Sequence, residues 1–372
     1  MSKYSIFLPN YSVGTDCYKE IPYLTRRFGK TVAVIGGHTA LSKAKPELEA
    51  GIAASDIKIL DYIWYGGDST YENVEKLKAM DSVKNADMLF GVGGGRACDT
   101  VKTVADMLDK PYFTFPTLAS NCASCTALAV IYNKDGSFKE YYYPHGPADH
   151  TFINTKIIAD SPERLLCAGI GDALSKEYEV LFTSREKFIY HTPLMGQTFC
   201  KMCTSPLLEY AQNALKACRS NKADFSLEQI ALDIIISTGI VSNLMTHENQ
   251  PDPKDNYFYN SSLAHCVYYG ASALPQCEEF LHGEIVAFGV LCLLTYDEQI
   301  DERDRIMRFN KSIGLPITLD ELKISQYDLI KIADKAVHSI EWTYVPGTPT
   351  KEKFIHAIML TDEAGNILLK KE

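Results

Sequence analysis

The sequence predicts an α/β fold in which a doubly wound, parallel-sheet domain of the Rossmann type is followed by an all-helical domain. Two observations predict it. Strand-like and helical runs alternate over about the first 150 residues, and this alternation is typical of parallel sheets with helices on both faces. After about residue 160, long stretches of helical period replace the strand-like runs.

The first part of the chain contains short apolar or β-branched runs that are followed by Gly or Pro, which is typical of strands. We expect strands over residues 31–35, 57–63, 88–92 and 111–115, and a helix over residues 74–80. Sheets of this type bind ligands beyond the carboxyl ends of their strands. Functional residues are therefore expected directly after these runs.

The second part is predicted to form helices over residues 162–182, 207–217, 227–245 and 284–296. Pro162 suits the first turn of a helix that is capped by Ser161. We therefore predict a dinucleotide-binding domain over residues 1–160 and a helical domain for metal and substrate over residues 161–372.

Length and charge exclude several classes of function. A chain of 372 residues exceeds one small domain. The formal net charge of −10 argues against sequence-independent binding to nucleic acid or to anionic membranes, since both require a basic surface. The first residues lack the apolar core of a secretory signal, and no apolar run reaches about 18 residues. We expect a cytoplasmic protein whose partners are small molecules.

Residues 90–102 form an apolar run that leads through Gly93, Gly94 and Gly95 into a helix. Glycines let the main chain approach a ligand closely, and the first amides of a helix attract phosphate oxygens. The segment predicts a cradle for a diphosphate. A tight strand-to-helix turn without a ligand is the alternative, because glycine-rich motifs are hypotheses by themselves.

The eleven cysteines include two pairs whose spacing resembles that of metal-binding motifs. Cys122 with Cys125, and Cys200 with Cys203, could together form a four-thiolate zinc site. The pairs lie 75 residues apart and lack the flanking glycine turns of a zinc knuckle. We favour reduced thiols, most of them acting as small buried apolar side chains.

A carboxylate and two imidazoles form a second candidate metal site. Asp172 lies in an otherwise apolar helical stretch, where it needs a partner. His265 and His282 lie on different segments, with Pro275 between them. One carboxylate and two imidazoles suit zinc or ferrous iron with a position left open for substrate. Taken singly, each residue also suits a structural role, as a helix cap or a core imidazole.

Four segments, taken in order, carry a resemblance to a known family: residues 91–102, 116–132, 168–174, and 264–265 with 281–284. Their order resembles the iron-containing alcohol dehydrogenase superfamily, and within it the glycerol dehydrogenase branch, whose architecture is dehydroquinate synthase-like. The resemblance implies a first domain that binds NAD or NADP. It also implies that Asp172, His265 and His282 hold one divalent metal, zinc with iron as the alternative.

The resemblance further implies an oxidoreductase that acts on CH–OH groups and assembles as a homo-oligomer. Hydride would pass between a short polyol, such as glycerol or a diol, and the nicotinamide, with the metal lowering the pKa of the hydroxyl. The implied cofactor-binding residues are Gly37, Gly93, Gly94, Gly95, Asp99, Thr117, Ser120, Leu128 and Tyr132.

Two departures from the branch bear on the substrate. Cys122 stands where the glycerol dehydrogenases carry an aspartate for the glycerol hydroxyls. Lys176 lies four residues after Asp172, on the same helix face, where iron-type relatives carry a metal-binding histidine. Lys176 could pair with Asp172, hold a substrate carboxylate, or be structural. A 2-hydroxycarboxylate (2-oxo acid) dehydrogenase is therefore the alternative to the polyol dehydrogenase, which we rank first.

The choice of dinucleotide stays open at this point. The first strand ends in Gly36 and Gly37 rather than in the aspartate that suits the ribose 2′-hydroxyl of NAD. Arg96 replaces the usual lysine of the glycine segment and keeps its positive charge. A dehydroquinate synthase-like lyase is less favoured, because residues 160–290 lack a Lys/Arg cluster for a substrate phosphate. A catalytically inactive dinucleotide-binding protein is the remaining alternative.

Overall fold

The computed structural model describes residues 5–248 and 256–371. The chain divides into two compact units. Of the described residues, the first unit contains 5–163 and 213–243, and the second contains 164–212, 244–248 and 256–371. The first segment of the first unit thus ends at Glu163, and the unit also includes residues 213–243, a helical segment that the predicted division at residue 160 had assigned to the second domain. Domains defined by function stay a prediction.

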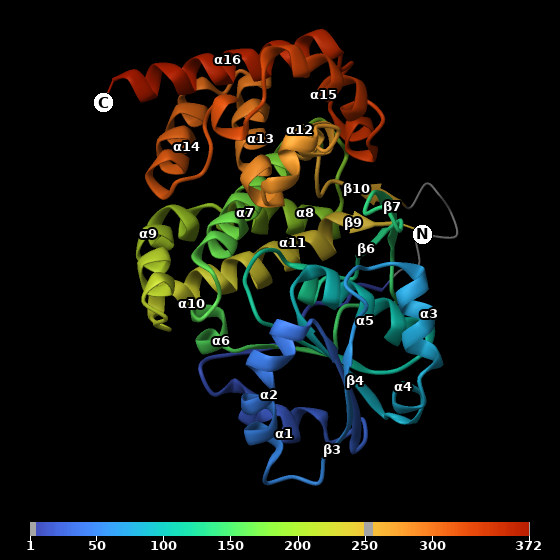
Figure 1. Ribbon diagram of the computed structural model, residues 1–372. Helices are drawn as coiled ribbons and strands as arrows, with labels where there is room; N and C mark the ends of the chain where they lie inside the picture. Colours follow the sequence, from blue (N-terminus) through green and yellow to red (C-terminus); the bar gives the residue numbers. More distant parts are fainter. Residues whose placement is uncertain (1–4, 249–255, 372) are drawn as a thin grey trace. The chain divides into compact units, whose positions relative to one another are not determined.

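A six-stranded parallel sheet forms the centre of the first unit, in the order β1-β8-β5-β4-β2-β3 (Figure 1). Its strands are β1 (Tyr11–Val13), β2 (Thr31–Gly36), β3 (Lys58–Trp64), β4 (Met88–Gly93), β5 (Tyr112–Pro116) and β8 (His150–Ile153). The four predicted strands are confirmed as β2, β3, β4 and β5. The sequence analysis missed β1 and β8 because runs of three and four residues are too short to show a period.

Helices cover both faces of this sheet. Successive residues of β4 point to opposite faces: Phe90 belongs to the same core cluster as Leu48 of α2, whereas Leu89 packs with Leu77 of α3 and Val101 of α5. Every residue of β4 is buried, as expected for a strand covered on two sides. The unit's first helices are α1 (Ile21–Thr25), α2 (His38–Ile52), α3 (Tyr71–Ala79), α4 (Asp81–Asn85), α5 (Gly95–Met107) and α6 (Thr155–Ala159).

Two further elements complete the first unit. An antiparallel pair, β6 (Ala129–Tyr132) and β7 (Phe138–Tyr142), follows the loop after β5. The apolar run that was predicted as one helix consists of α10 (Phe225–Leu232), a π-helical turn at Asp233–Ser237, and α11 (Thr238–Met245). This run is long and apolar enough to cross a membrane by length and composition alone, but most of it is buried, which is typical of a core helix.

The second unit is built almost entirely of helices. They are α7 (Glu163–Thr183), α8 (His191–Phe199), α9 (Ser205–Arg219), α12 (Leu263–Ala271), α13 (His282–Tyr296), α14 (Ile300–Ile313), α15 (Leu329–Ala336) and α16 (Lys351–Lys370). The second half of α9, from residue 213, belongs to the first unit. The predicted helices within α7, α9 and α13 are confirmed. The prediction of an all-helical part omitted one short antiparallel pair, β9 (Thr246–His247) and β10 (Tyr257–Phe258).

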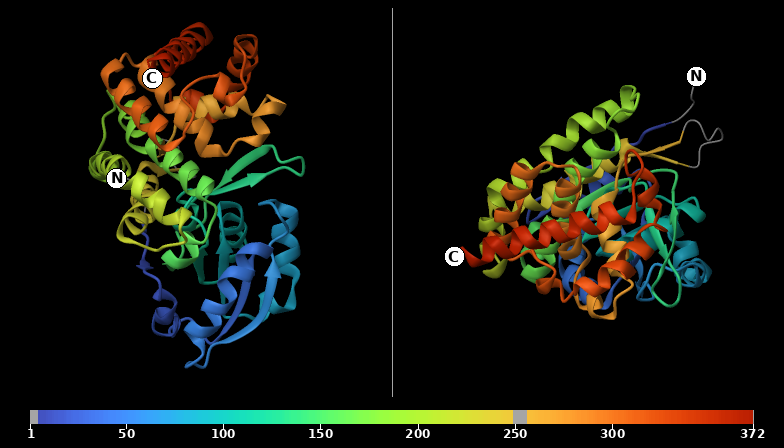
Figure 2. Two further views of the ribbon diagram at one scale, coloured as in Figure 1. Left: turned by 60° about the vertical axis from the view of Figure 1, so that its left-hand side comes forward. Right: turned by 90° about the horizontal axis from the view of Figure 1, so that it is seen from above.

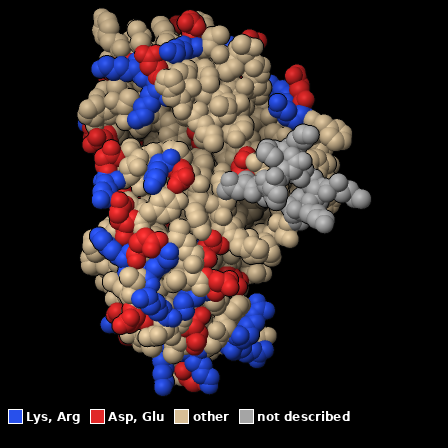
Figure 3. Space-filling view, turned by 90° about the vertical axis from the view of Figure 1, so that its right-hand side faces the viewer, with Lys and Arg blue, Asp and Glu red and all other residues tan. Residues whose placement is uncertain are grey.

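Helix α13 forms the core of the second unit. All its residues from Ile285 to Tyr296 are buried, and α12, α14 and α16 pack against it. Figures 1 and 2 show α16 at the C-terminal end of the chain, beside α13. On the face drawn in Figure 3, basic and acidic side chains are interspersed along the left margin and over the lower part, while the upper centre carries few charges.

Candidate functional site

Three helices of the second unit bring Asp172, His265 and His282 together. Asp172 lies on α7, His265 lies near the start of α12, and His282 is the first residue of α13. One ligand atom from each residue lies within 4.8 Å of the other two. The Asp172 Oδ1 is 3.0 Å from the His282 Nε2 and 3.8 Å from the His265 Nε2. The side chain of His282 is 38% exposed, against 14% and 16% for the other two, so the cluster opens beside it.

Glycines allow the three helices to approach closely enough for these distances. A Cβ added to Gly283 of α13 would lie 1.8 Å from the carbonyl oxygen of Ala168 of α7. A Cβ on Gly289 would lie 2.3 Å from the carbonyl oxygen of Ala264 of α12. Any side chain at either position would force the main chains apart, because closely packed interiors have no space to give.

Glu179 orients His265, and the sequence analysis missed it. Its side chain is fully buried on α7, and its Oε2 accepts a hydrogen bond of 2.7 Å from the His265 Nδ1. Its Oε1 accepts from the main-chain amides of Ser262 and His265. These bonds fix the ring and leave its Nε2 facing Asp172, as carboxylates do behind metal-binding histidines. The available signal was the spacing, since Glu179 lies seven residues after Asp172 on one helix face.

The pKa directions in this cluster follow from its buried charges. Burial opposes the charged form of His265, but the Glu179 carboxylate together with Asp172 and Glu341 outweighs it, so the pKa of His265 is raised. Burial likewise opposes ionisation of Asp172, but His282, His265 and Lys176 outweigh it, so the pKa of Asp172 is lowered. A carboxylate that stays ionised and an imidazole whose tautomer is fixed are suitable metal ligands.

The residues in this cluster fit a divalent metal. One aspartate and two histidines are a donor set for zinc or iron that leaves a position open, and Glu179 supplies the outer carboxylate that such sites commonly use. Within the part of the chain that the structure describes, no cluster of metal-binding side chains includes Cys122, Cys125, Cys200 or Cys203. The thiol of Cys125 instead donates to the carbonyl oxygen of Ile235.

The glycine segment forms an open turn at the carboxyl end of β4. Gly93 has a φ of +146°, which favours glycine, and Gly94 caps α5 without a side chain that could bond the first amides of the helix. A Cβ on Gly93 would lie 4.0 Å from the amide nitrogen of Gly37, so the turns after β2 and β4 are neighbours. The amide of Thr117 donates to the carbonyl oxygen of Gly93. This edge fits a diphosphate.

Comparison with known proteins identifies the family. Residues 9–152 match the family model described as iron-containing alcohol dehydrogenase. A glycerol dehydrogenase from Thermotoga maritima is 31% identical over 315 residues, covering 82% of each chain. This chain belongs to the iron-containing alcohol dehydrogenase family.

Further relatives place the chain in the glycerol dehydrogenase-like branch of this family. A glycerol dehydrogenase from Escherichia coli is 27% identical over 375 residues, covering 97% of each chain. A probable glycerol dehydrogenase from Sinorhizobium meliloti has the same fold, with a TM-score of 0.82, 24% identity, and coverage of 98% of this chain and 99% of the other. The predicted fold class and family are confirmed, and the chain is an oxidoreductase that acts on alcohol groups.

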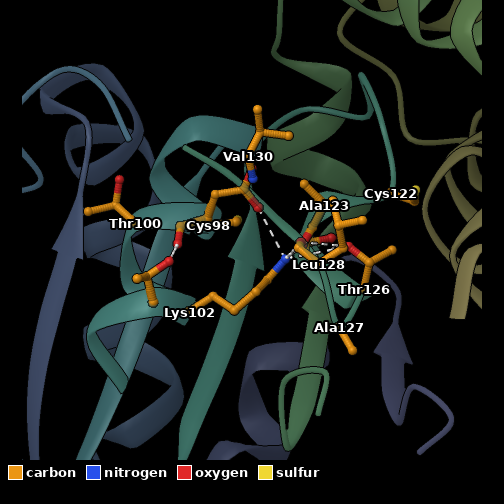
Figure 4. A network of polar contacts seen from close by, with 12 residues as sticks. Cys98, Thr100, Lys102, Cys122, Ala123, Thr126, Ala127, Leu128 and Val130 are labelled. Carbon is orange, nitrogen blue, oxygen red and sulfur yellow. Dashed lines mark hydrogen bonds and ion pairs between the residues drawn. The ribbon is translucent and has the colours of Figure 1, made fainter. Parts of the chain in front are cut away.

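The buried Lys102 contacts two of the predicted cofactor residues, Asp99 and Leu128. Figure 4 shows its ammonium group beside Leu128 and Ala123 of the loop after β5. The Nζ of Lys102 donates to the Asp99 carboxylate at 3.1 Å, to the Leu128 carbonyl at 2.5 Å and to the Ala123 carbonyl at 2.9 Å. The other Asp99 oxygen accepts from the amide of Val130. These bonds tie the loop after β5 to α5. Direct contact of Asp99 or Leu128 with a dinucleotide stays a prediction.

The remaining predicted residues of the first unit surround the same edge. The guanidinium of Arg96 lies over the ring of Tyr132, 4.9 Å from its centre, and pairs with Asp68 at 3.2 Å. Ser120 is half-buried on the loop after β5. The sequence analysis did not foresee that His38, directly after Gly37, stacks on Trp64 with ring centres 5.2 Å apart. An aromatic surface therefore adjoins the turn after β2.

Proposed function

We propose that this chain is a metal-dependent polyol dehydrogenase that transfers hydride between a short polyol or diol and NAD or NADP. The observation that carries the proposal is the approach of Asp172, His265 and His282 within 4.8 Å. The glycine turn after β4 supports the dinucleotide, and the names of the relatives from Thermotoga maritima and Escherichia coli support the polyol.

The chain's own residues would supply binding and orientation. A divalent metal lowers the pKa of a nearby hydroxyl, and a nicotinamide dinucleotide accepts hydride from the carbon that bears it. Asp172, His265 and His282 would hold the metal, while Glu179 keeps a hydrogen on the His265 Nδ1 and so leaves the Nε2 lone pair available. The amides that follow Gly94 would bind the diphosphate.

We propose zinc as the metal, with iron as the alternative, and leave both dinucleotides in the proposal. No carboxylate follows β2 at Gly36 or Gly37 to repel a 2′-phosphate. We also propose that the protein is a cytoplasmic homo-oligomer without nucleic-acid or membrane partners. The family resemblance supports the homo-oligomer, and the net charge of −10 argues against nucleic acid and anionic membranes as partners. We propose that the functional domains are those predicted from the sequence. Residues 1–160 would bind the dinucleotide, and residues 161–372 would bind the metal and the substrate.

The test is metal-dependent turnover. The metal-free protein is loaded with zinc, ferrous iron or magnesium and assayed with glycerol, diols and hydroxy acids, using each dinucleotide. We expect zinc or iron to restore reduction of the dinucleotide by alcohols, and His282→Ala to abolish metal binding and turnover. His338→Ala, which removes an exposed histidine, is the matched control. Turnover that survives metal removal would contradict the proposal, and phosphate release from a phosphorylated keto sugar would favour a lyase.

A further inference from the structure

Lys176 is a buried cation that forms no ion pair with a carboxylate in the described part of the chain. Its side chain lies on α7, and the residue is 7% exposed. Its Nζ donates to the Asn260 Oδ1 at 2.5 Å and approaches the Asn260 carbonyl oxygen at 3.5 Å. Both acceptors are neutral. Among the described residues, no carboxylate oxygen lies within 4.0 Å of this Nζ.

Lys102, the other buried lysine among the described residues, shows which partners a buried ammonium group usually has. Lys102 is fully buried, and its Nζ contacts the Asp99 carboxylate as well as the carbonyl oxygens of Ala123 and Leu128. An ammonium group has three N–H donors, and once removed from water it is stabilised by an anion or by a full set of acceptors. Lys176 has the two oxygens of one residue, so at least one donor remains available.

Lys176 belongs to the surroundings of the candidate metal site. It shares one face of α7 with Asp172 and Glu179, at spacings of four and three residues. Asn260, which holds it, lies five residues before His265 on the segment that leads into α12. Burial opposes ionisation of Asp172, but Lys176, after the two histidines, is among the positive groups that lower its pKa. The ammonium charge therefore acts on the site.

Two buried carboxylates near this site accept hydrogen bonds from groups other than Lys176. Both oxygens of Glu179 are occupied by the amides of Ser262 and His265 and by the ring of His265. Glu341 accepts a hydrogen bond from the Ser261 hydroxyl. Neither carboxylate contacts Lys176. Asp172 lies close enough for Lys176 to lower its pKa, but its Oδ1 faces the rings of His282 and His265. A carboxylate in hydrogen-bond contact with Lys176 would therefore come from a ligand.

We propose that Lys176 binds the carboxylate of the substrate, and that the preferred substrate is a short hydroxy compound with a carboxylate on the carbon next to the reacting hydroxyl. The proposal rests on the metal-dependent alcohol oxidation of the proposed function, and it replaces the polyol by the 2-hydroxy acid that the sequence analysis gave as the alternative substrate. In the oxidation, the C2–H bond breaks and its electron pair passes as hydride to the nicotinamide. The hydroxyl proton goes to solvent, C2 and its oxygen form a carbonyl, and the carboxylate stays unchanged and bound to Lys176.

The test compares an acid ligand with a neutral one. Calorimetry measures binding of oxamate, an unreactive analogue of a 2-oxo acid, and of propylene glycol to the full-length, zinc-loaded protein with reduced dinucleotide. The variants are Lys176→Met, Lys176→Arg and, as the matched control, Lys201→Met, which removes an exposed lysine. Thermal unfolding midpoints verify that each variant is folded.

We expect the wild-type protein to bind oxamate more tightly than propylene glycol. Lys176→Met should lower the ratio of the two affinities by about tenfold or more, the effect of a lost charge-assisted hydrogen bond. Lys176→Arg should restore part of the ratio, and Lys201→Met should leave it as in the wild type. An equal loss for both ligands would show a structural lysine and would overturn the proposal.

The same experiment distinguishes the carboxylate proposal from the proposed function on which it rests. If the zinc-loaded protein oxidises diols while acids neither bind nor react, the carboxylate proposal is wrong and the proposed function stands. If the protein binds no metal and oxidises no alcohol, the proposed function itself is wrong. A steeper dependence of KM than of kcat on Lys176→Met, for hydroxy acids alone, would support binding of the carboxylate by this lysine.

Discussion

Replacing Glu179 with Gln should weaken metal binding at the Asp172–His265–His282 cluster. The Glu179 Oε2 is 2.7 Å from the His265 Nδ1, and the carboxylate is fully buried. In Glu179→Gln the amide oxygen can keep the main-chain bonds, which leaves the amide NH₂ group facing Nδ1. Two donors cannot bond each other, so the ring must either lose this bond or move its hydrogen to Nε2, where it would block the metal-binding lone pair.

The expected loss is about 10- to 100-fold in metal affinity, the usual range for outer partners of metal-binding histidines, or about 1.4 to 2.8 kcal/mol. The upper end applies because the bond is buried and charge-assisted. The assay is competition for zinc against a chromophoric chelator, with circular dichroism to verify folding. Glu177→Gln is the matched control, since Glu177 lies on the same helix and lines a surface hollow with Lys201 and Arg305.

The reasoning would be refuted if Glu179→Gln and Glu177→Gln both bound zinc within about threefold of the wild-type protein, because the outer carboxylate would then not orient the ring. A loss in both variants would point instead to a general effect on α7. Only a loss confined to Glu179→Gln agrees with the geometry of the site.

Three further predictions concern stability. Gly283→Ala should destabilise the protein by about 3 kcal/mol or more, because its Cβ would overlap the Ala168 carbonyl; a urea midpoint equal to that of the wild type would contradict this. Burial raises the pKa of Asp233 to about 8, so the unfolded chain releases this proton first and stability falls as pH rises from about 4 to about 8. In Asp233→Asn this pH dependence should be absent, so the variant's free energy of unfolding should rise relative to that of the wild type by about 1.4 kcal/mol per pH unit. Urea unfolding of both proteins at about pH 5 and about pH 7 tests this, and a difference between variant and wild type that is the same at both pH values would refute it. Lys102→Met leaves the buried Asp99 carboxylate unpaired and should destabilise by about 3 to 5 kcal/mol and weaken dinucleotide binding, measured by unfolding and by fluorescence of the reduced dinucleotide; loss of neither would show that the loop after β5 needs no such anchor.

Local patterns in the sequence predict much of the first unit. Strands β2, β3, β4 and β5 are long enough to show their β-branched and apolar composition, and the glycines after β4 mark a turn that other residues avoid. Elements of three or four residues, such as β1 and β8, form because neighbouring strands offer hydrogen-bond partners. Their own sequences are too short to predict a strand.

The sequence by itself determined which side chains could serve as metal ligands, since Asp172, His265 and His282 lie in segments whose order resembles one family. Only the tertiary structure decided what surrounds them. Glu179 meets His265 across 86 residues of sequence, and Lys176 meets Asn260 across 84. Such pairs form only where α7, α12 and α13 cross. Close packing at glycines sets where these helices cross, and the local sequence of one helix does not show which residues of another helix it will contact.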